Sequence, residues 1–333
     1  MKYICLPVLF LLLIASCSRG GKSASLFLYN MKDPYVRTFG NQIKSESSQI
    51  FEMQIFDSQN SQIIQNEFIE NQIDSAHIML INPVDRLGAY SIIKKLKSVN
   101  MPVIFFNREP LFEDLEIWDQ AYYVGARAEQ SGQIQAEMLM ELFGDDGENL
   151  NKYDRNGNDI IETVILKGEQ GHQDAETRTS EVLRTFTENH FRLDILITEV
   201  ANWNRDEAFE KMKQILDRYS EDIELVISNN DAMALGAISL MTQEGFFRDS
   251  NENGRIDKDD SSWLPVVGID GLIEAVNSIN EGFLYGTVIN DSRLQAKAIA
   301  ELADFLCSGK DLKGMNYPLD RGKYIWIDYK VFQ

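Results

Sequence analysis

The sequence predicts an α/β protein built from two Rossmann-like parallel-sheet domains. Three observations favour this fold: the length of 333 residues, short apolar runs that alternate with longer helical patterns, and a second series of such runs that starts at Thr163. At roughly 150 residues per domain, the length fits two domains. The composition, with 44% hydrophobic and 25% charged residues and only 7 Pro, is typical of a globular protein.

Residues 1–16, MKYICLPVLFLLLIAS, predict a secretory signal peptide with a basic start at Lys2 and an apolar run. The run is shorter than the roughly 20 apolar residues that a transmembrane helix needs. The four residues that end at Cys17 resemble the lipobox of bacterial lipoproteins, which predicts cleavage before Cys17 and its lipidation. The alternatives are ordinary cleavage that leaves Cys17 free, and a membrane-spanning segment.

Residues 17–25 are predicted to form a flexible, Gly- and Ser-containing tether that an acyl chain on Cys17 would anchor to a membrane. Cys5 would leave with the signal peptide, so Cys307 would have no partner and no disulfide is expected. The predicted location is therefore the periplasm or the cell surface.

Short apolar runs predict five strands in each half of the mature chain, with helical patterns between them. The runs of the first half are Leu26–Tyr29, Phe51–Phe56, His77–Ile81, Val103–Phe106 and Tyr122–Val124. Those of the second half are Thr163–Leu166, Ile195–Val200, Leu225–Ser228, Val266–Ile269 and Thr287–Ile289.

Polar residues follow most of these strands, at the edge where parallel sheets bind ligands. They are Lys32, Asp33, Asn107, His172, Asp174, Trp203, Asn229–Asp231, Asp270, Asn290 and Asp291. Because Asp and Asn at this place also cap helices, each residue alone is more often a cap than a ligand. The pattern over both halves nevertheless favours a binding cleft.

Charge and missing motifs exclude several functions. The formal net charge of -20 disfavours a nucleic-acid-binding surface. The first strand is followed by YNMKDP instead of the G-x-G-x-x-G of dinucleotide-binding enzymes. Neither H-E-x-x-H nor G-x-S-x-G occurs, which disfavours hydrolases.

Residues 249–260, DSNENGRIDKDD, match the spacing of a twelve-residue EF-hand calcium loop, with Gly254 at its sharp turn. The predicted ligands are Asp249, Asn251, Asn253, Arg255, Asp257 and Asp260. Asp260 stands where Glu is usual, which predicts weaker binding. The alternative is an acidic surface turn without metal.

Residues 154–162, DRNGNDIIE, form a shorter loop of the same kind. Its predicted ligands are Asp154, Asn156, Asn158, Glu162 and the carbonyl of Ile160. The loop ends after nine residues, so a closing carboxylate must come from elsewhere in the chain.

Several segments resemble the periplasmic glucose/galactose-binding proteins of bacterial sugar uptake and chemotaxis. They are PVIFFNREP, AYYVG, ETVILKGEQGHQDAETRTSEV, ELVISNNDAMALGA, VVGIDG and GTVINDSRLQAKA, in the family's order. The resemblance implies a periplasmic-binding-protein fold whose two lobes are joined by a three-segment hinge. It also implies that Glu224 is the remote carboxylate of a structural calcium site at residues 154–162.

The resemblance divides the chain into a first lobe, residues 26–126 with 291–323, and a second lobe, residues 127–290 with 324–333. One hexose would lie between them. The residues implied to hold it are Asp33, Tyr35, Asn107, His172, Asp174, Arg178, Trp203, Asn230, Asp270 and Asn290. Tyr35 stands where the family usually has phenylalanine, so its additional hydroxyl needs a hydrogen-bond partner or room.

The chemistry of these residues suits a pyranose. Asp, Asn and Arg side chains can bind neighbouring hydroxyls in pairs. Aromatic rings such as Trp203 and Tyr35 can cover the apolar faces of the sugar ring.

The resemblance predicts a monomeric, lipid-anchored, calcium-binding protein that binds D-glucose or D-galactose and delivers it to an ABC importer permease. It is not expected to be an enzyme, and the family's role in chemotaxis adds signalling to a chemoreceptor as a further expectation. The rival hypotheses are a sugar-processing enzyme and a sugar-responsive transcription regulator on the same fold. The regulator would need a basic DNA-binding segment before Leu26, where this chain has a predicted signal peptide.

Overall fold

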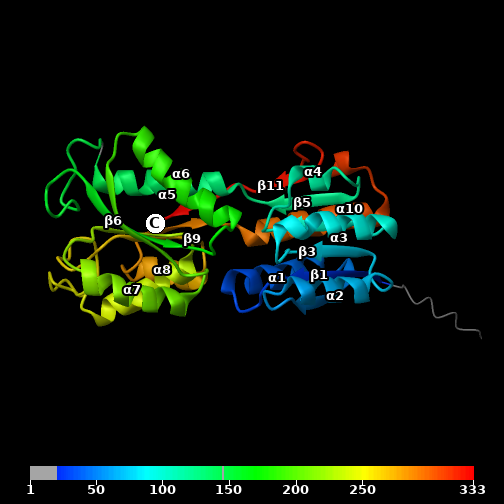
Figure 1. Cartoon of the computed structure of the whole chain (residues 1–333), viewed down its shortest axis with the longest axis horizontal. Helices are drawn as coiled ribbons and strands as arrows, with labels where there is room; N and C mark the ends of the chain where they lie inside the picture. Colours follow the sequence, from blue (N-terminus) through cyan, green and yellow to red (C-terminus); the bar gives the residue numbers. More distant parts are fainter. Residues whose placement is uncertain (1–20, 145) are drawn as a thin grey trace, which may run out of the picture.

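A computed structural model describes residues 21–144 and 146–333. These residues form two α/β lobes that lie side by side, each with a parallel sheet between layers of helices (Figure 1). The predicted signal peptide and Cys17 lie outside the described residues. The two-domain α/β prediction is confirmed.

Each lobe contains a six-stranded sheet within the described part of the chain. The first sheet has the order β11-β5-β4-β3-β1-β2 and the second β12-β10-β9-β8-β6-β7. All neighbours pair in parallel except β12, which runs antiparallel to β10. The strands are β1 Lys22–Leu28, β2 Phe51–Asp57, β3 Ile78–Ile81, β4 Val103–Phe106, β5 Ala121–Gly125, β6 Ile161–Lys167, β7 Leu193–Val200, β8 Leu225–Ser228, β9 Val266–Asp270, β10 Gly286–Ile289, β11 Tyr324–Trp326 and β12 Lys330–Phe332.

Helices connect successive strands and cover both faces of each sheet (Figure 1). They are α1 Pro34–Ser47, α2 Gln62–Gln72, α3 Ala89–Ser98, α4 Phe112–Leu115, α5 Ala128–Phe143, α6 Gln173–Glu188, α7 Arg205–Tyr219, α8 Asp231–Gln243, α9 Ile273–Asn280 and α10 Ser292–Ser308. Two short 3₁₀ helices, Arg86–Gly88 and Leu312–Gly314, complete the set.

Local sequence explains these elements. The central strands β3 and β4 read IMLI and VIFF and are buried along their whole length, as parallel strands covered on both faces must be. Helix α1 begins with Pro34 directly after its cap Asp33, which places a residue with no backbone N–H where none is needed. Helix α10 ends at Ser308 and is capped by Gly309, whose left-handed φ of 62° suits glycine.

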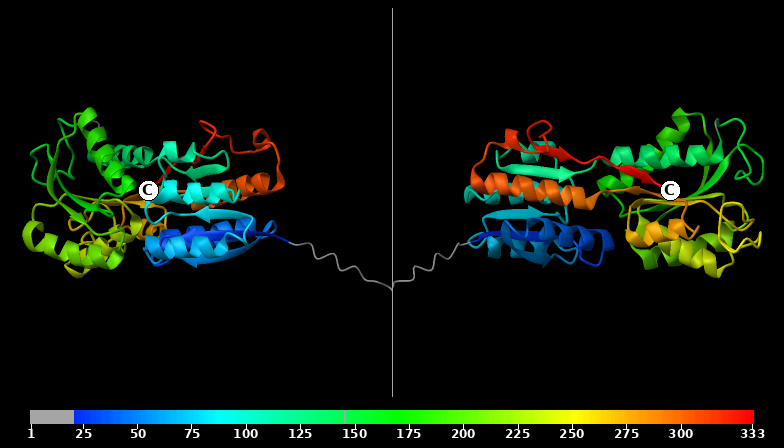
Figure 2. Two further views of the ribbon diagram at one scale, coloured as in Figure 1. Left: turned by 45° about the vertical axis from the view of Figure 1, so that its right-hand side comes forward. Right: turned by 180° about the vertical axis from the view of Figure 1, so that it is seen from behind.

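The chain passes between the lobes at three places in the described residues. The first lies between β5 and α5, and the second between β10 and α10. The third lies between β11, which pairs with β5 of the first sheet, and β12, which pairs with β10 of the second. Both views in Figure 2 show the C-terminal segment running from one lobe to the other.

Two predicted boundaries are wrong. Residues 324–326 were assigned to the second lobe, but β11 belongs to the first sheet, so the third crossing lies within residues 327–329. The tether was predicted to extend to residue 25, but Lys22–Ser25 already belong to β1. The pairing between β1 and β2 already begins at Lys22, which lies opposite Phe51. Hydrogen bonds to the neighbouring strand satisfy the backbone of this polar segment, so that Ser25 can be buried.

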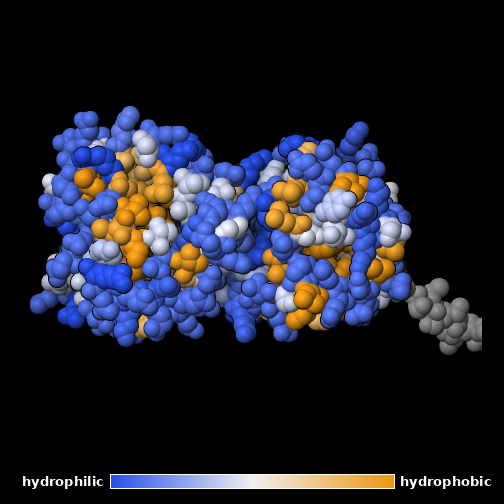
Figure 3. All heavy atoms as spheres, in the orientation of Figure 1, coloured by the Kyte–Doolittle hydropathy of each residue, from blue (hydrophilic) through white to orange (hydrophobic). Residues whose placement is uncertain are grey.

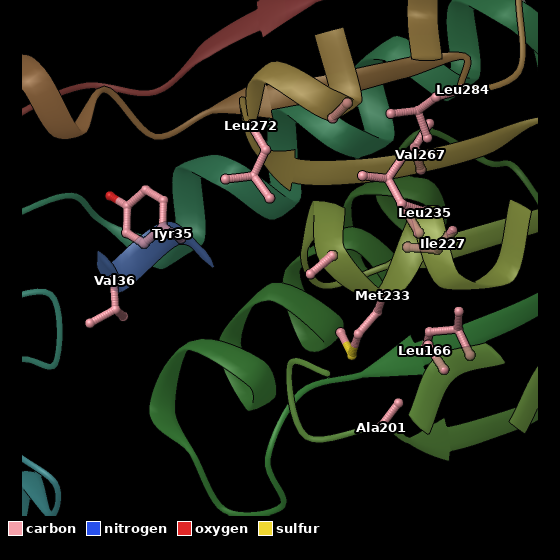
Figure 4. Packing of buried hydrophobic residues seen from close by; sticks show 14 of the residues in the cluster. Tyr35, Val36, Leu166, Ala201, Ile227, Met233, Leu235, Val267, Leu272 and Leu284 are labelled. Atoms are coloured by element: carbon pink, nitrogen blue, oxygen red, sulfur yellow. The ribbon is translucent and has the colours of Figure 1, made fainter. Parts of the chain in front are cut away.

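The apolar core extends into both lobes. Figure 4 shows members of one buried cluster, with Tyr35 and Val36 from α1 and Met233 and Leu272 from the second lobe. In the view of Figure 3, apolar residues gather on each lobe while the junction between the lobes is mostly hydrophilic. Among the described residues, no helix is long and apolar enough to span a membrane.

Candidate functional site

Polar side chains from both lobes meet where the strands of the two sheets end. Three of them have a left-handed backbone that is uncommon outside glycine: Asn107 with φ 62°, Trp203 with φ 62° and Asp270 with φ 129°. Such conformations cost free energy and concentrate at functional sites. Three such residues around one cavity favour a functional role for the cleft.

Asp33 ends the loop after β1 and caps α1. Its Oδ1 accepts hydrogen bonds from the backbone N–H groups of Tyr35, at 2.9 Å, and Val36, at 3.2 Å. Its Oδ2 accepts a bond of 2.5 Å from the hydroxyl of Tyr29. Burial raises the pKa of Asp33, and these hydrogen bonds oppose the rise. The carboxyl group is thus held in one orientation at the cavity wall.

Tyr35 follows in the first turn of α1 and is 6% exposed. Its hydroxyl is buried and has no hydrogen-bond partner within the described residues. Burial raises the pKa of Tyr35 well above its usual value, and the nearby Asp270 carboxyl raises it further. The hydroxyl therefore needs a partner, such as a bound ligand.

His172 caps α6 through its Nδ1, which accepts a bond of 3.1 Å from the N–H of Asp174. Burial lowers the pKa of His172 well below its usual value, and nearby arginines, Arg108 first, lower it further. The ring is therefore neutral, with its proton on Nε2, which can donate to a ligand.

Arg178 lies one turn later on α6 and is 4% exposed. It donates to the carbonyl of Asn229 at 2.7 Å and to the hydroxyl of Tyr329 at 3.1 Å, while its Nε has no partner in the described residues. Carboxylate oxygens of Asp174 and Asp270 lie 3.8 and 4.0 Å from it. Two carboxylates thus flank a fixed guanidinium, and burial raises the pKa of both.

Trp203 presents its indole to the cavity next to His172, with ring centroids 5.2 Å apart and an edge-on angle of 78°. A side chain at Gly168 would place its Cβ 2.3 Å from the indole, so only glycine permits this position. Asn230 caps α8 through a bond of 3.0 Å from the N–H of Met233 and donates to the Trp203 carbonyl at 3.3 Å. Helix α8 and the loop before α7 are joined by this contact.

Nine of the ten predicted sugar-binding residues line one cavity between the lobes. They are Asp33, Tyr35, Asn107, His172, Asp174, Arg178, Trp203, Asn230 and Asp270. The cavity is small, with a volume of about 30 Å³. The two lobes therefore lie close together around it, and a hexose would enter once they separate.

Asn290 is the exception. It is buried, but it does not line the cavity, and its amide oxygen accepts a bond of 2.5 Å from Gln295. Its backbone N–H donates to the carbonyl of Asp270 at 3.1 Å. Asn290 lies at the second crossing between the lobes, and it contacts the cavity only indirectly, through Asp270.

Two residues that line the cavity, Tyr29 and Arg108, were missed by the sequence analysis. Arg108 is 6% exposed, lies with its guanidinium carbon 3.9 Å from the Tyr29 ring, and donates to Glu169 of the second lobe at 3.0 Å. Tyr29 ends a predicted strand, and Arg108 directly follows the predicted site residue Asn107. These positions are the only signal that the sequence offers for the two residues.

The loop 154–162 lies at the far end of the second lobe with three buried carboxylates. Asp154, Glu162 and Glu224 are each less than 9% exposed, and Glu162 Oε2 has no partner in the described residues. Burial and the neighbouring Glu162 raise the pKa of Glu224 to about 7. An orphaned carboxylate oxygen beside other buried acids fits a cation with oxygen ligands.

The loop 249–260 has its turn at Gly254, where φ is 88°. Both oxygens of Asp260 accept backbone N–H groups, including those of Ser250 at 2.7 Å and Asp257 at 2.9 Å. Asp257 accepts from Asn253 and pairs with Arg255 at 3.2 Å. Its acids are thus more fully satisfied than those of the first loop.

No group of three or more His, Cys, Asp or Glu side chains in the described ranges is arranged to hold a metal ion. A calcium ion at either loop would therefore also need Asn side chains and backbone carbonyls. In the first loop Asn158 turns its Nδ2 toward Glu162 at 2.9 Å, so its amide would have to present oxygen instead.

Comparison with known proteins identifies the family. The model of a family described as "Periplasmic binding protein domain" matches residues 24–311. The chain belongs to this family. It is 34% identical over 287 residues to the D-galactose/methyl-galactoside binding periplasmic protein MglB of Haemophilus influenzae, covering 85% of this chain and 81% of that protein. It is 22% identical to the ribose import binding protein RbsB of Escherichia coli, covering 89% of this chain and 88% of that protein.

Solved structures share the periplasmic-binding fold. An ABC transporter solute binding protein from Bacillus halodurans with bound myo-inositol has a TM-score of 0.74 at 24% identity, over 94% of each chain. A myo-inositol binding protein from Caulobacter has a TM-score of 0.74 at 18% identity, again over 94% of each chain. At these identities the likeness establishes the fold alone.

Membership in the periplasmic binding family makes this chain an exported sugar-binding protein of the ABC-transport type and not an enzyme. The predicted fold and the predicted lack of catalysis are confirmed by it. The particular sugar, the calcium ions, the lipid anchor and the chemoreceptor stay predictions.

Proposed function

We propose that this protein binds D-galactose or D-glucose in the cleft between its lobes and delivers it to an ABC importer permease. The observation that carries the proposal is the convergence of nine predicted residues from both lobes on one cavity. The galactose-binding name of the 34% identical relative supports the choice of hexose.

The cavity offers the groups that a pyranose needs. The carboxylates of Asp33, Asp174 and Asp270 can accept from hydroxyls, and Arg178 Nε and His172 Nε2 can donate to them. The Trp203 indole can cover an apolar face of the ring. Since these groups come from both lobes, a bound sugar would favour the closed form over the open one.

Calorimetric titration with a panel of monosaccharides tests this function. We expect D-galactose or D-glucose to bind with micromolar or tighter affinity and one sugar per chain, and labelled sugar to be recovered unchanged. Ribose and myo-inositol are the informative competitors, because a 22% identical protein is named for ribose import and a 24% identical structure holds bound myo-inositol. Preference for either of them would overturn the hexose assignment.

We further propose that calcium supports the second lobe. Asp154, Asn156, Asn158, the carbonyl of Ile160, Glu162 and Glu224 would hold one ion, and the loop 249–260 a second, weaker one. The ion would neutralise the buried acids of the first loop and so stabilise the lobe. The orphaned oxygen of Glu162 supports the first site most directly.

We also propose that an acyl chain on Cys17 anchors the exported protein to a membrane. The described chain begins β1 at Lys22, at the end of the first lobe that lies away from the second lobe (Figure 1). An anchor attached there would leave both lobes free to move relative to each other. Signalling to a chemoreceptor is an expectation of the resemblance.

A further inference from the structure

The cleft between the lobes contains a second space beside the central cavity. A side chamber of about 270 Å³ adjoins the central cavity and shares Arg108, His172 and Asp174 with it. We propose that this chamber binds a second, uncharged, hydroxyl-bearing unit attached to the hexose. The ligands would then include neutral disaccharides. This inference rests on the proposed hexose site.

Two buried polar atoms on residues that line the side chamber have no partner among the described residues. They are Arg108 Nε, a donor on a side chain that is 6% exposed, and Gln173 Oε1, an acceptor. Arg108 uses its other nitrogens on the carbonyl of Val84 and on Glu169, and Gln173 donates to Glu109 at 3.2 Å. Buried groups without partners are costly. Hydroxyl groups of a ligand, which both donate and accept, would satisfy both atoms.

Charge selects against an anionic substituent. Four acids line the chamber, Asp85, Glu109, Glu169 and Asp174, against the arginines Arg86 and Arg108. Both arginines already have acceptors, since Arg86 Nε donates to the carbonyl of Glu109 at 2.5 Å. His172 is neutral because burial lowers its pKa. A phosphate or carboxylate would therefore meet excess negative charge, whereas a neutral sugar unit would not.

A second chamber, which shares Asn60 and Glu169 with the first, provides the comparison. It has a similar volume of about 280 Å³ and is lined by residues such as Lys32, Asn202 and Asp206. None of its lining residues in the described chain carries a buried polar atom without a partner. The two chambers thus have similar volumes, but only the chamber at Gln173 is lined by described residues with buried polar atoms that lack a hydrogen-bond partner.

The test is calorimetric titration of the full protein with D-galactose, D-glucose, lactose, melibiose, maltose and cellobiose. We expect at least one disaccharide to bind within tenfold of the better hexose, or more tightly. Gln173→Leu should then weaken that disaccharide at least fivefold and change hexose affinity less than twofold. Asp206→Asn, in the other chamber, should change neither.

Two results would overturn the inference and leave the hexose function standing. One is that every disaccharide binds more than tenfold more weakly than the better hexose. The other is that Gln173→Leu weakens disaccharide and hexose equally, which would make Gln173 a general support of the cleft. If neither hexoses nor disaccharides bind, the proposed function fails together with this inference.

Discussion

At the scale of single residues, several side chains in the cleft have two roles. Asp33, His172 and Asn230 each cap a helix through one side-chain atom and also line the cavity. The sequence left open whether such residues are caps or ligands. Because one polar side chain has more than one hydrogen-bonding atom, a cap can also be a ligand.

Loss of the indole at position 203 should abolish tight hexose binding. Trp203→Ala removes the ring that would stack on the sugar, and a loss of at least tenfold in affinity, about 1.4 kcal/mol, is expected in titration. Trp326→Ala truncates an equally large ring outside the cavity and should leave the affinity unchanged. An affinity of Trp203→Ala equal to that of the parent would show that the cavity is wrongly assigned.

Asp33 should contribute through its charge. Asp33→Asn keeps a capping side chain, so α1 should remain stable, while the loss of a charged acceptor should weaken hexose binding by about 1.5–3 kcal/mol. Asp33→Ala should abolish binding and also lower the free energy of unfolding by about 0.5–2 kcal/mol through the lost cap. Titration and thermal melting separate the two effects. Equal binding by Asp33→Asn and the parent would remove Asp33 from the site.

At the scale of elements, the acidic loops lie in the second lobe away from the cleft. The segments that flank the two loops are in contact, because Lys152 pairs with Asp259 and the ring of Tyr153 lies 5.7 Å from that of Trp263. Neither loop shares a residue with the cavity between the lobes. Any ion there would stabilise the lobe without touching the sugar.

Chelation of calcium should lower the melting temperature. An ion bound only by the folded state adds about 2.7 kcal/mol when free calcium is a hundredfold above the dissociation constant. Native mass spectrometry should count two ions, one of which is lost in Glu224→Gln and the other, more weakly held, in Asp249→Asn. The exposed Glu148→Gln should lose none. A count of one ion in the parent rejects the second loop, and an unchanged melting temperature rejects the structural role of both.

At the scale of the whole molecule, the closed arrangement of the lobes buries several carboxyl groups of the cleft. Burial raises the pKa of Asp33, Asp174 and Asp270 in the closed form, against the opposing effect of Arg108 and Arg178. In an open form these groups would regain solvent and their ordinary pKa values, near 4. Closure of the lobes without bound sugar would therefore take up protons, so low pH favours the closed form.

The sugar-free protein should accordingly become more compact as the pH falls from 7 toward 4. Small-angle scattering would register a smaller radius of gyration, and Asp270→Asn should reduce the change because it removes one of the titrating groups. Saturating sugar should keep the protein compact over the whole range. A radius that is independent of pH in the sugar-free parent would contradict the assignment.

Replacement of Cys17 by alanine should release the whole protein from the membrane fraction, because acyl chains and not a spanning helix are proposed to hold it. Cys307→Ala, at the other cysteine of the mature chain, should leave the protein anchored. Fractionation followed by immunoblotting measures both. A Cys17→Ala protein that stays tightly bound to the membrane would exclude the lipobox.

The sequence alone determined the two sheets and most of the cavity. Buried parallel strands read as apolar runs such as VIFF, and the polar residues that follow them meet at one edge whatever the details of packing. Only the tertiary structure decided the rest. The three-residue strands β11 and β12 are too short to carry a pattern, so their partners from distant segments assign them to different sheets. Arg108 and Gln173 gain their importance from the opposite lobe, and Asn290 turns its amide to Gln295 and not to the cavity. Contacts of this kind depend on where two lobes meet, which no local spacing of residues encodes.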